Sequence, residues 1–287
     1  MNDRSEGYVV LLPHPKGERR PSAQGPLCDW PAPSQRHARK FLRVDGTWWD
    51  PQGGEGRDWL ELWTEYEAPT LTEPLSPRSR YPSFVHNIVS RVGPPSLNTD
   101  PWIFRPGFVW TICRHNRADK VRAGDIVLFG SSVDGDWVVD TVFVVDKRLN
   151  RISEGRLGEI YETCVLATLE PADLRPFLGR PFSSATDPFS FVPCKMARES
   201  HAPFPRLSAT RLLKSLRKLS DDRMPSKKNA QALVVCKANN GLAIFWRDLI
   251  DEVRNQGLIC GTSFSHPGLT VEGSSAAWRR TCTSYTR

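Results

Sequence analysis

The sequence predicts an α+β protein with an antiparallel, barrel-like mixed sheet and a few peripheral helices. Segments rich in Val, Ile, Trp and Phe, which are typical of strands, gather in the middle of the chain without helical segments between them. This order disfavours a doubly wound parallel sheet, in which helices alternate with strands. Helical periodicity is found in the last third of the chain. We expect a single domain over residues 1–268 and a loosely ordered basic tail over residues 269–287.

The expected strands begin close to the start of the sequence. The apolar run Tyr8–Leu12 predicts a first strand that ends at a proline. Phe41–Val44 and Trp48–Trp49 flank an Asp-Gly pair, so they predict a hairpin with a D-G turn. Side chains alternate over Asp58–Glu67, which predicts a strand with carboxylates and indoles on one face and leucines on the other. Further strands are expected at residues 108–113, 126–130, 137–145, 163–169, 232–237 and 258–260.

Two helices and four loops complete the predicted elements. One helix is expected to begin after Ser208 as its N-cap and to bury leucines at i, i+4 and i+7, ending near Leu219. The second is expected over Leu242–Gln256, with Gly257 as its stop. Proline-rich segments predict irregular loops at residues 15–37, 68–83, 92–106 and 186–206.

The composition excludes several classes of protein. Hydrophobic residues make up 39% and charged residues 25% of the 287 positions, which excludes a disordered tail protein. The apolar runs are far shorter than the roughly 18 residues that a membrane-spanning helix needs, so no membrane partner is expected. The seven cysteines form no C-x-x-C pair, and we therefore expect no metal site and no cofactor. Reduced thiols and the absence of a signal-peptide pattern predict a cytoplasmic protein.

The excess of positive charge is confined to one stretch. Residues 195–228 contain ten Lys and Arg against three Asp and Glu, so this stretch alone accounts for the net charge of +7. Its predicted helix can present basic side chains beside the leucines, and such a concentration of charge attracts polyanions. A solvated outer face of the helix is the other interpretation. The candidate nucleic-acid-binding residues are Arg211, Lys214, Arg217, Lys218, Lys227 and Lys228.

Common catalytic motifs are absent from the sequence. It contains no P-loop, no G-x-G-x-x-G after a strand, no G-x-S-x-G and no H-E-x-x-H. A nuclease of the two-carboxylate-plus-lysine type needs a spacer that Asp140 and Asp146-Lys147 do not have. Nucleotide hydrolysis by a P-loop, a dinucleotide fold and a hydrolase elbow therefore have no support.

Polar residues beside aromatic ones mark a candidate ligand site. Glu65 and Glu67 lie on the predicted face that carries Trp63, and carboxylates beside indoles can hydrogen-bond a base edge while the rings stack on it. Core tryptophans with glutamates at the wet end of the strand are the alternative. A turn contains further donors, acceptors and an indole, although an Asx-turn explains it equally well. The candidate ligand-binding residues are Trp63, Glu65, Glu67, Asn98, Asp100 and Trp102.

Three residues are candidates for catalysis. Asp140 interrupts an apolar strand, where a carboxylate must be hydrogen-bonded or functional. His14 follows the first strand in a stiff turn, where a histidine can also cap its neighbours, and Glu18 lies in the same turn. With Glu65 and Asp100, these residues could act as acids, bases or metal ligands.

Several motifs resemble those of a family of uncharacterised bacterial proteins. That family carries H-P-G-G-E-H, W-G-E-W-E-P-P-S, N-T-D-P-W-V-F, I-L-F-G-S and D-T-V-F-V-V in this order, and the match covers residues 9–147. Lys16, Arg19 and Thr64 depart from its motifs, and the family implies no activity. The matching segments here are residues 13–18, 63–70, 98–104, 124–131 and 140–145.

The G-D-I-V-L-F segment and the following strand are also similar to the central hairpin of PUA-like barrels, the EVE, ASCH and YTH group. That resemblance implies a small barrel that holds a modified or flipped base in an aromatic pocket. The first interpretation is thus a nucleic-acid-binding protein that reads such a base, and enzymatic activity is left open. The alternatives are a metal-dependent or acid/base enzyme acting on nucleic acid or nucleotide, and a protein–protein interaction module.

Overall fold

The computed structural model describes fifteen segments of the chain. They are residues 7–14, 39–66, 70–75, 84–89, 91–92, 99–111, 118–133, 136–150, 157–158, 160–162, 175–197, 205–220, 232–236, 240–267 and 269–270. The first expected loop, the strand expected at 163–169 and nearly all of the expected tail lie outside these segments.

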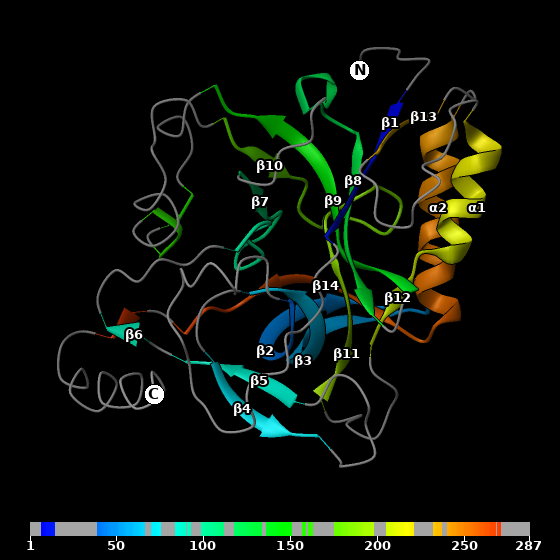
Figure 1. The fold of residues 1–287 in the computed structure, drawn as a ribbon. Helices are drawn as coiled ribbons and strands as arrows, with labels where there is room; N and C mark the ends of the chain where they lie inside the picture. The colour runs from blue at the N-terminus through cyan, green and yellow to red at the C-terminus, as the bar shows by residue number, and fades with distance from the viewer. Residues whose placement is uncertain are drawn as a thin grey trace, which may run out of the picture.

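Two large sheets and two helices form the described structure, which agrees with the α+β class (Figure 1). The seven-stranded sheet has the order β13 (Ala232–Cys236), β1 (Gly7–His14), β8 (Ile126–Val133), β9 (Asp136–Arg148), β10 (Phe177–Gly179) and β7 (Val109–Trp110), with β12 (Leu207–Ser208) also on β9. The six-stranded sheet has the order β14 (Ile259–Phe264), β11 (Val192–Met196), β3 (Glu55–Glu65), β2 (Arg39–Trp49), β5 (Phe84–Ile88) and β4 (Thr70–Pro74). A small sheet pairs β15 (Leu269–Thr270) with β6 (Arg91–Val92), and a short 3₁₀ helix covers Ala118–Lys120.

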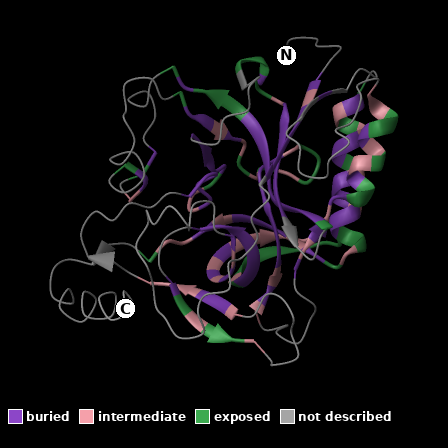
Figure 2. Ribbon diagram, in the orientation of Figure 1, coloured by how far each residue is buried: buried purple, intermediate pink, exposed green. Residues whose placement is uncertain are grey.

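The seven-stranded sheet is covered on both faces, which explains the nearly continuous apolar sequence of β9. One face packs Phe129 and Phe143 into a core shared with the six-stranded sheet. The other face packs Val142 and Val144 beneath α1 (Thr210–Leu219) and α2 (Gly241–Asn255), which lie together along one side of the molecule (Figures 1 and 2). Each such buried side chain contributes about 1.5–3 kcal/mol, so β9 is a central stabilising element.

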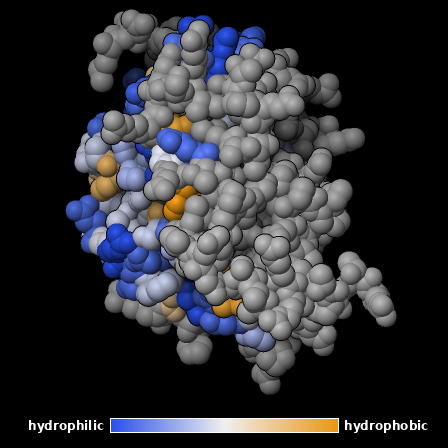
Figure 3. Space-filling model, turned by 90° about the vertical axis from the view of Figure 1, so that its left-hand side faces the viewer, coloured by the Kyte–Doolittle hydropathy of each residue, from blue (hydrophilic) through white to orange (hydrophobic). Residues whose placement is uncertain are grey.

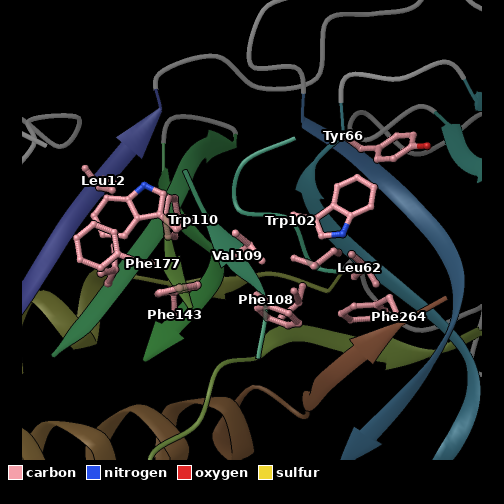
Figure 4. Close-up of a cluster of buried hydrophobic side chains, with 14 of the residues drawn as sticks. Leu12, Leu62, Tyr66, Trp102, Phe108, Val109, Trp110, Phe143, Phe177 and Phe264 are labelled. Atoms are coloured by element: carbon pink, nitrogen blue, oxygen red, sulfur yellow. The ribbon is translucent and has the colours of Figure 1, made fainter. Parts of the chain in front are cut away.

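The shared core extends from one sheet to the other. In Figure 4, Leu12, Trp110 and Phe177 lie at one end of the cluster, and Tyr66 and Trp102 lie at the other. The core therefore connects β1 and β10 with the end of β3 and the segment that carries Trp102.

Pairing within the six-stranded sheet closes on itself. β14 pairs with β11 and also with the second half of β2, while β3 pairs with both β2 and β11. The first half of β2 instead pairs in parallel with β5. The strands β2, β3, β11 and β14 thus form a closed cycle of pairing, on which β5 and β4 extend outward.

The predicted hairpin at residues 41–49 is wrong. β2 continues from Arg39 to Trp49 and pairs with β3 along its whole length, so Asp45 and Gly46 are strand residues. The chain reverses at Asp50–Gly54 instead, where Gly53 and Gly54 have φ of +116° and +114°. Those left-handed values favour glycine, which explains why the turn forms at this pair.

Two predicted loops contain strands. β4 lies within the loop predicted at 68–83, and β11, with Pro193 inside it, lies within the loop predicted at 186–206. Both form because strands distant in the sequence pair with them, which a local proline count does not detect. The strand expected at 108–113 forms only at Val109–Trp110 among the described residues. β14 extends four residues beyond its predicted end at Cys260.

The helices lie close to their predicted positions. Ser208 belongs to β12, and the N-cap of α1 is Ala209, although the Thr210 N–H still donates to Ser208 Oγ at 3.4 Å. α2 ends just before Gly257, whose φ of +63° stops the helix as expected. Neither helix of the described segments has the length and apolar character needed to cross a membrane.

Candidate functional site

A buried polar centre lies where the two large sheets meet. Arg39 begins β2 and pairs in register with Glu65, the last residue of β3. Its guanidinium makes an ion pair with Glu65 Oε2, and its Nε donates to Asp140 Oδ2 at 2.7 Å. The guanidinium therefore joins a carboxylate of the six-stranded sheet to a carboxylate of the seven-stranded sheet. We call Arg39, Trp63, Glu65, Asp100, Ser131 and Asp140 the polar centre.

A β-bulge directs Asp140 into this position. Phe129 pairs with Thr141 and Gly130 pairs with Val139, so Asp140 has no partner in the register. Such a bulge changes the direction of a side chain. A Cβ on Gly130 would lie 2.2 Å from Trp137 Nε1, so the close approach at the bulge requires glycine.

Two further side chains complete the hydrogen bonds across the junction. Ser131 Oγ donates to Asp140 Oδ1 at 2.8 Å and accepts a hydrogen bond from Trp63 Nε1 at 2.7 Å. Both oxygens of Asp140 are thus hydrogen-bonded. The indole of Trp63 is oriented by this hydrogen bond and packs with Phe41, Val85 and Val138 in a small separate cluster.

Burial dominates the electrostatics of the polar centre. Arg39, Glu65 and Asp140 are each no more than 2% exposed. Burial raises the pKa of Asp140 to about 6, although Arg39 and the Ser131 hydrogen bond act in the opposite direction. Charges taken out of water cost several kcal/mol each unless they are paired, so removing one member is expected to be strongly destabilising.

Asp100 connects the polar centre to the segment that follows it. Its backbone N–H donates to Glu65 Oε1 at 3.3 Å, and its Oδ1 accepts a hydrogen bond from the Thr111 N–H at 2.8 Å. The Thr111 hydroxyl in turn bonds Tyr161, whose pKa is raised mainly by burial. The segment from Asp100 to Thr111 is therefore fixed to β3 at its start and closed across its base.

An aromatic cluster adjoins the polar centre through Glu65–Tyr66 and Asp100–Trp102. The Trp102 and His266 rings are stacked, with centroids 5.7 Å apart and an angle of 30° between planes. Phe104 packs edge-on against Trp102 at 4.8 Å, and Tyr66 OH lies 3.2 Å from His266 Nε2. Phe104 and His266 are partly exposed, whereas Tyr66, Trp102 and Tyr161 are buried. We call Tyr66, Trp102, Phe104, Tyr161 and His266 the aromatic cluster.

Two cations adjoin the aromatic cluster. Lys40 Nζ lies 5.5 Å from the centre of the Tyr66 ring, within range of a cation–π interaction. Burial lowers the pKa of Arg105, which the neighbouring Tyr161 partly opposes. Rings with cations beside them can contact both the bases and the phosphates of a nucleic acid.

The structure brings together four of the predicted site residues. Trp63, Glu65, Asp100 and Asp140 share the polar centre, whereas Trp102 lies in the adjoining aromatic cluster. The two indoles belong to different clusters of buried side chains. Of the other candidates, His14 ends β1 with its backbone in register with Ser131. Glu18, Glu67 and Asn98 lie outside the described residues.

Sequence reasoning did not identify Arg39 or Ser131. A single arginine after a proline-rich segment carries no local signal. A buried carboxylate such as Asp140 does require a partner, but 101 residues separate it from Arg39. Ser131 ends the segment that resembles the I-L-F-G-S motif, and this resemblance is the signal that could have identified it.

The predicted nucleic-acid-binding residues lie in a different place. Arg211, Lys214 and Lys218 line one side of a groove of about 350 Å³ between α1 and α2. Three carboxylates of α2 line the other side, so this groove contains both signs of charge. Arg217 is exposed and does not line the groove, and Lys227 and Lys228 lie outside the described residues. We call Arg211, Lys214, Lys218, Asp248, Asp251 and Glu252 the charged groove.

The charged groove and the polar centre are on opposite sides of β9. Val139 packs with Leu212 of α1, whereas the neighbouring Asp140 bonds Arg39 of the six-stranded sheet. Figure 3 shows the side away from the helices, where the visible described residues are mainly hydrophilic with small hydrophobic patches between them. β9 therefore separates α1 from the polar centre.

No metal-ligand arrangement is found in the parts of the chain that the structure describes, where no three His, Cys, Asp or Glu side chains are grouped to hold an ion. Comparisons with family models, curated proteins and solved structures give no match to this chain.

Proposed function

We propose that the protein binds nucleic acid and takes one base, modified or flipped out of its strand, against the aromatic cluster. The stacked Trp102–His266 pair supports this proposal, because His266 and the edge-on Phe104 are partly exposed and two cations adjoin the same cluster. A base has a π-face that can extend such a stack, and stacking is worth about 1–3 kcal/mol per base.

In this proposal the polar centre positions the cluster and does not itself contact the base. Both oxygens of Asp140 accept hydrogen bonds, and both oxygens of Glu65 contact a donor. Glu65 thereby ties the Asp100 backbone to the end of β3. Tyr66 and Trp102, which follow these two residues, are consequently held in a fixed mutual orientation before any ligand arrives, which reduces the entropy cost of binding.

The PUA-like resemblance belongs to the same proposal. The closed cycle of pairing among β2, β3, β11 and β14 supports a barrel-like arrangement. The antiparallel pair β8–β9, which includes the G-D-I-V-L-F segment, contributes two of the side chains that place the polar centre.

Removal of the partly exposed rings tests this function. We expect Phe104→Ala and His266→Ala each to weaken binding of a labelled single-stranded oligonucleotide by about tenfold, which follows from the loss of one stacking contact. Phe182→Ala is the matched control, because Phe182 is also partly buried and stacks on Trp49 elsewhere. Fluorescence anisotropy against oligonucleotides with and without modified bases measures the affinities. Equal effects of all three variants, or no binding by the parent protein, would overturn the proposal.

One observation favours a second candidate, an acid/base enzyme acting on nucleic acid or nucleotide. Asp140 has a pKa of about 6, near the value that suits a general acid or base at neutral pH. Incubation with nucleotides and oligonucleotides, followed by chromatography, tests it. Product formed by the parent protein but not by Asp140→Asn supports catalysis, and no product above a protein-free control contradicts it.

A further inference from the structure

The charged groove opposes a basic edge to an acidic edge. Arg211, Lys214 and Lys218 are three and four residues apart, so they follow one another along α1. Asp251 and Glu252 lie three and four residues after Asp248, so both are its neighbours on one face of α2. The two edges touch across the groove, where Arg211 Nη1 lies 3.4 Å from Glu252 Oε2 and Ser215 Oγ bonds Asp248.

The acidic edge is held in place by its own contacts. Glu252 is 6% exposed and accepts a hydrogen bond from Gln256 Nε2 at 2.5 Å. Asp251 pairs with Arg254 at 3.0 Å. Beneath the groove, the buried leucines of α1 pack with apolar residues of α2, so the helices cannot separate without exposing a core; these residues are Leu212, Leu216, Phe245, Leu249 and Val253.

The separation of the edges is short on the scale of ionic screening. Arg211 Nη1 lies 3.4 Å from Glu252 Oε2, whereas the Debye length at physiological ionic strength is about 8 Å. A phosphate placed on the basic edge of α1 therefore interacts with the carboxylates of α2 as well. Three cations and three carboxylates line the groove, so they cancel at that distance.

We infer that the acidic edge of α2 acts as an intramolecular competitor that keeps polyanions off the basic edge of α1. Glu252 pairs with Arg211, and Asp248 and Asp251 line the same groove as Lys214 and Lys218, so their negative charge offsets the positive charge that phosphates would otherwise meet. The carboxylates thereby weaken non-specific binding of nucleic acid to this basic helix. This inference is independent of base recognition at the aromatic cluster, which lies on the other side of β9.

Neutralising the acidic edge tests the inference. The double variant Asp248→Asn/Asp251→Asn is expected to bind heparin and a mixed-sequence DNA duplex about tenfold more tightly at low salt. The log–log slope of its duplex affinity against salt is expected to steepen by an amount that corresponds to about two phosphate contacts. Adding Lys214→Ala/Lys218→Ala to that variant is expected to remove the gain, because these lysines line the groove together with the two neutralised carboxylates.

A matched control separates this local effect from a change in total charge. Asp119 pairs with Arg148 at 3.0 Å, and Asp187 accepts a hydrogen bond from Ser184 at 3.1 Å, so they resemble Asp251 and Asp248 in their contacts. Asp119→Asn/Asp187→Asn changes the net charge equally, but neither residue lines the charged groove, and we expect less than a twofold gain. Equal gains in both double variants, or none in either, would overturn the inference. Heparin has no bases, so its result stands whether or not Phe104→Ala affects oligonucleotide binding.

Discussion

The polar centre and the charged groove use the same pair of groups in opposite surroundings. In the centre, the Arg39 side chain is buried and its Nε lies 2.7 Å from Asp140. In the groove, the Arg211 side chain is 70% exposed and lies 3.4 Å from Glu252. Water screens the second pair and is excluded from the first. The comparison shows that the contribution of an arginine–carboxylate contact to stability depends on how far the contact is buried.

The two regions also differ in what they connect. The centre joins the ends of β2 and β3 to β8 and β9, so it fixes the junction between the two large sheets. The groove lies over a helix pair that is already held by an apolar core. We therefore expect changes in the centre to alter stability and changes in the groove to alter binding.

The largest expected difference concerns the two arginines. Arg39→Met leaves two buried carboxylates without their shared guanidinium and should lower the free energy of unfolding by about 3–5 kcal/mol. Arg211→Met removes an exposed, screened pair and should cost less than about 1 kcal/mol. Urea unfolding followed by circular dichroism measures both values. Similar costs for the two variants would show that the centre is not the stabilising junction described above.

The pH dependence of stability gives a second test. The folded-state pKa of Asp140 is raised to about 6 from an ordinary 3.8, so the folded protein keeps a proton that the unfolded chain has lost between these values. Stability from this group is present below about pH 4 and is lost as the pH rises to about 6, by about 3 kcal/mol.

Asp140→Asn isolates this contribution because asparagine does not titrate. The free energy of unfolding of the variant, relative to the parent protein, should increase from pH 4 to pH 6 and stay constant above pH 7. Urea titrations at each pH provide the values. A difference between variant and parent that does not change with pH would contradict the raised pKa.

Serines provide a smaller comparison of the two regions. Ser131→Ala removes the donor to Asp140 and the acceptor of Trp63 Nε1, both buried, and should cost about 1–3 kcal/mol. Ser215→Ala removes a bond to Asp248 at the edge of the groove, where water can replace it, and should cost less than about 1 kcal/mol. Thermal unfolding of the two variants at matched concentration ranks them, and the reverse order would count against the distinction.

Local sequence patterns predict much of this fold but not its junctions. The apolar runs at residues 126–130 and 137–145 predict β8 and β9, and the leucine spacing predicts α1, because those signals depend on each segment alone. β11 contains Pro193 and depends on partners from β3 and β14, so no local pattern indicates it. Pairing between distant segments is a property of the whole chain.

The same distinction applies to the candidate site. Glu65, Asp100 and Asp140 attract notice as carboxylates among apolar residues, and burial requires each of them to have hydrogen-bond or charge partners once the chain folds. Arg39 could not be identified in this way, because an arginine at a strand end is ordinary. The charge of residues 195–228 predicts a polyanion-binding face only if the neighbouring element is neutral. α2 is not, and its carboxylates become neighbours of α1 only in the folded protein.

The smallest expected effect is a difference between two cations of α1 in how much each contributes to the salt dependence of binding. Arg217 is exposed outside the charged groove, whereas Lys214 faces the carboxylates of α2. A phosphate neutralised by Arg217 should release its full complement of counterions, so Arg217→Ala should reduce the log–log salt slope for a duplex by about 0.9. Lys214→Ala should reduce that slope by less than half as much, because the carboxylates of α2 already offset the charge of Lys214. Anisotropy titrations with a mixed-sequence duplex over a range of salt concentrations measure both slopes. If Lys214→Ala reduced the slope as much as Arg217→Ala, the carboxylates of α2 would not be competing for the charge of α1.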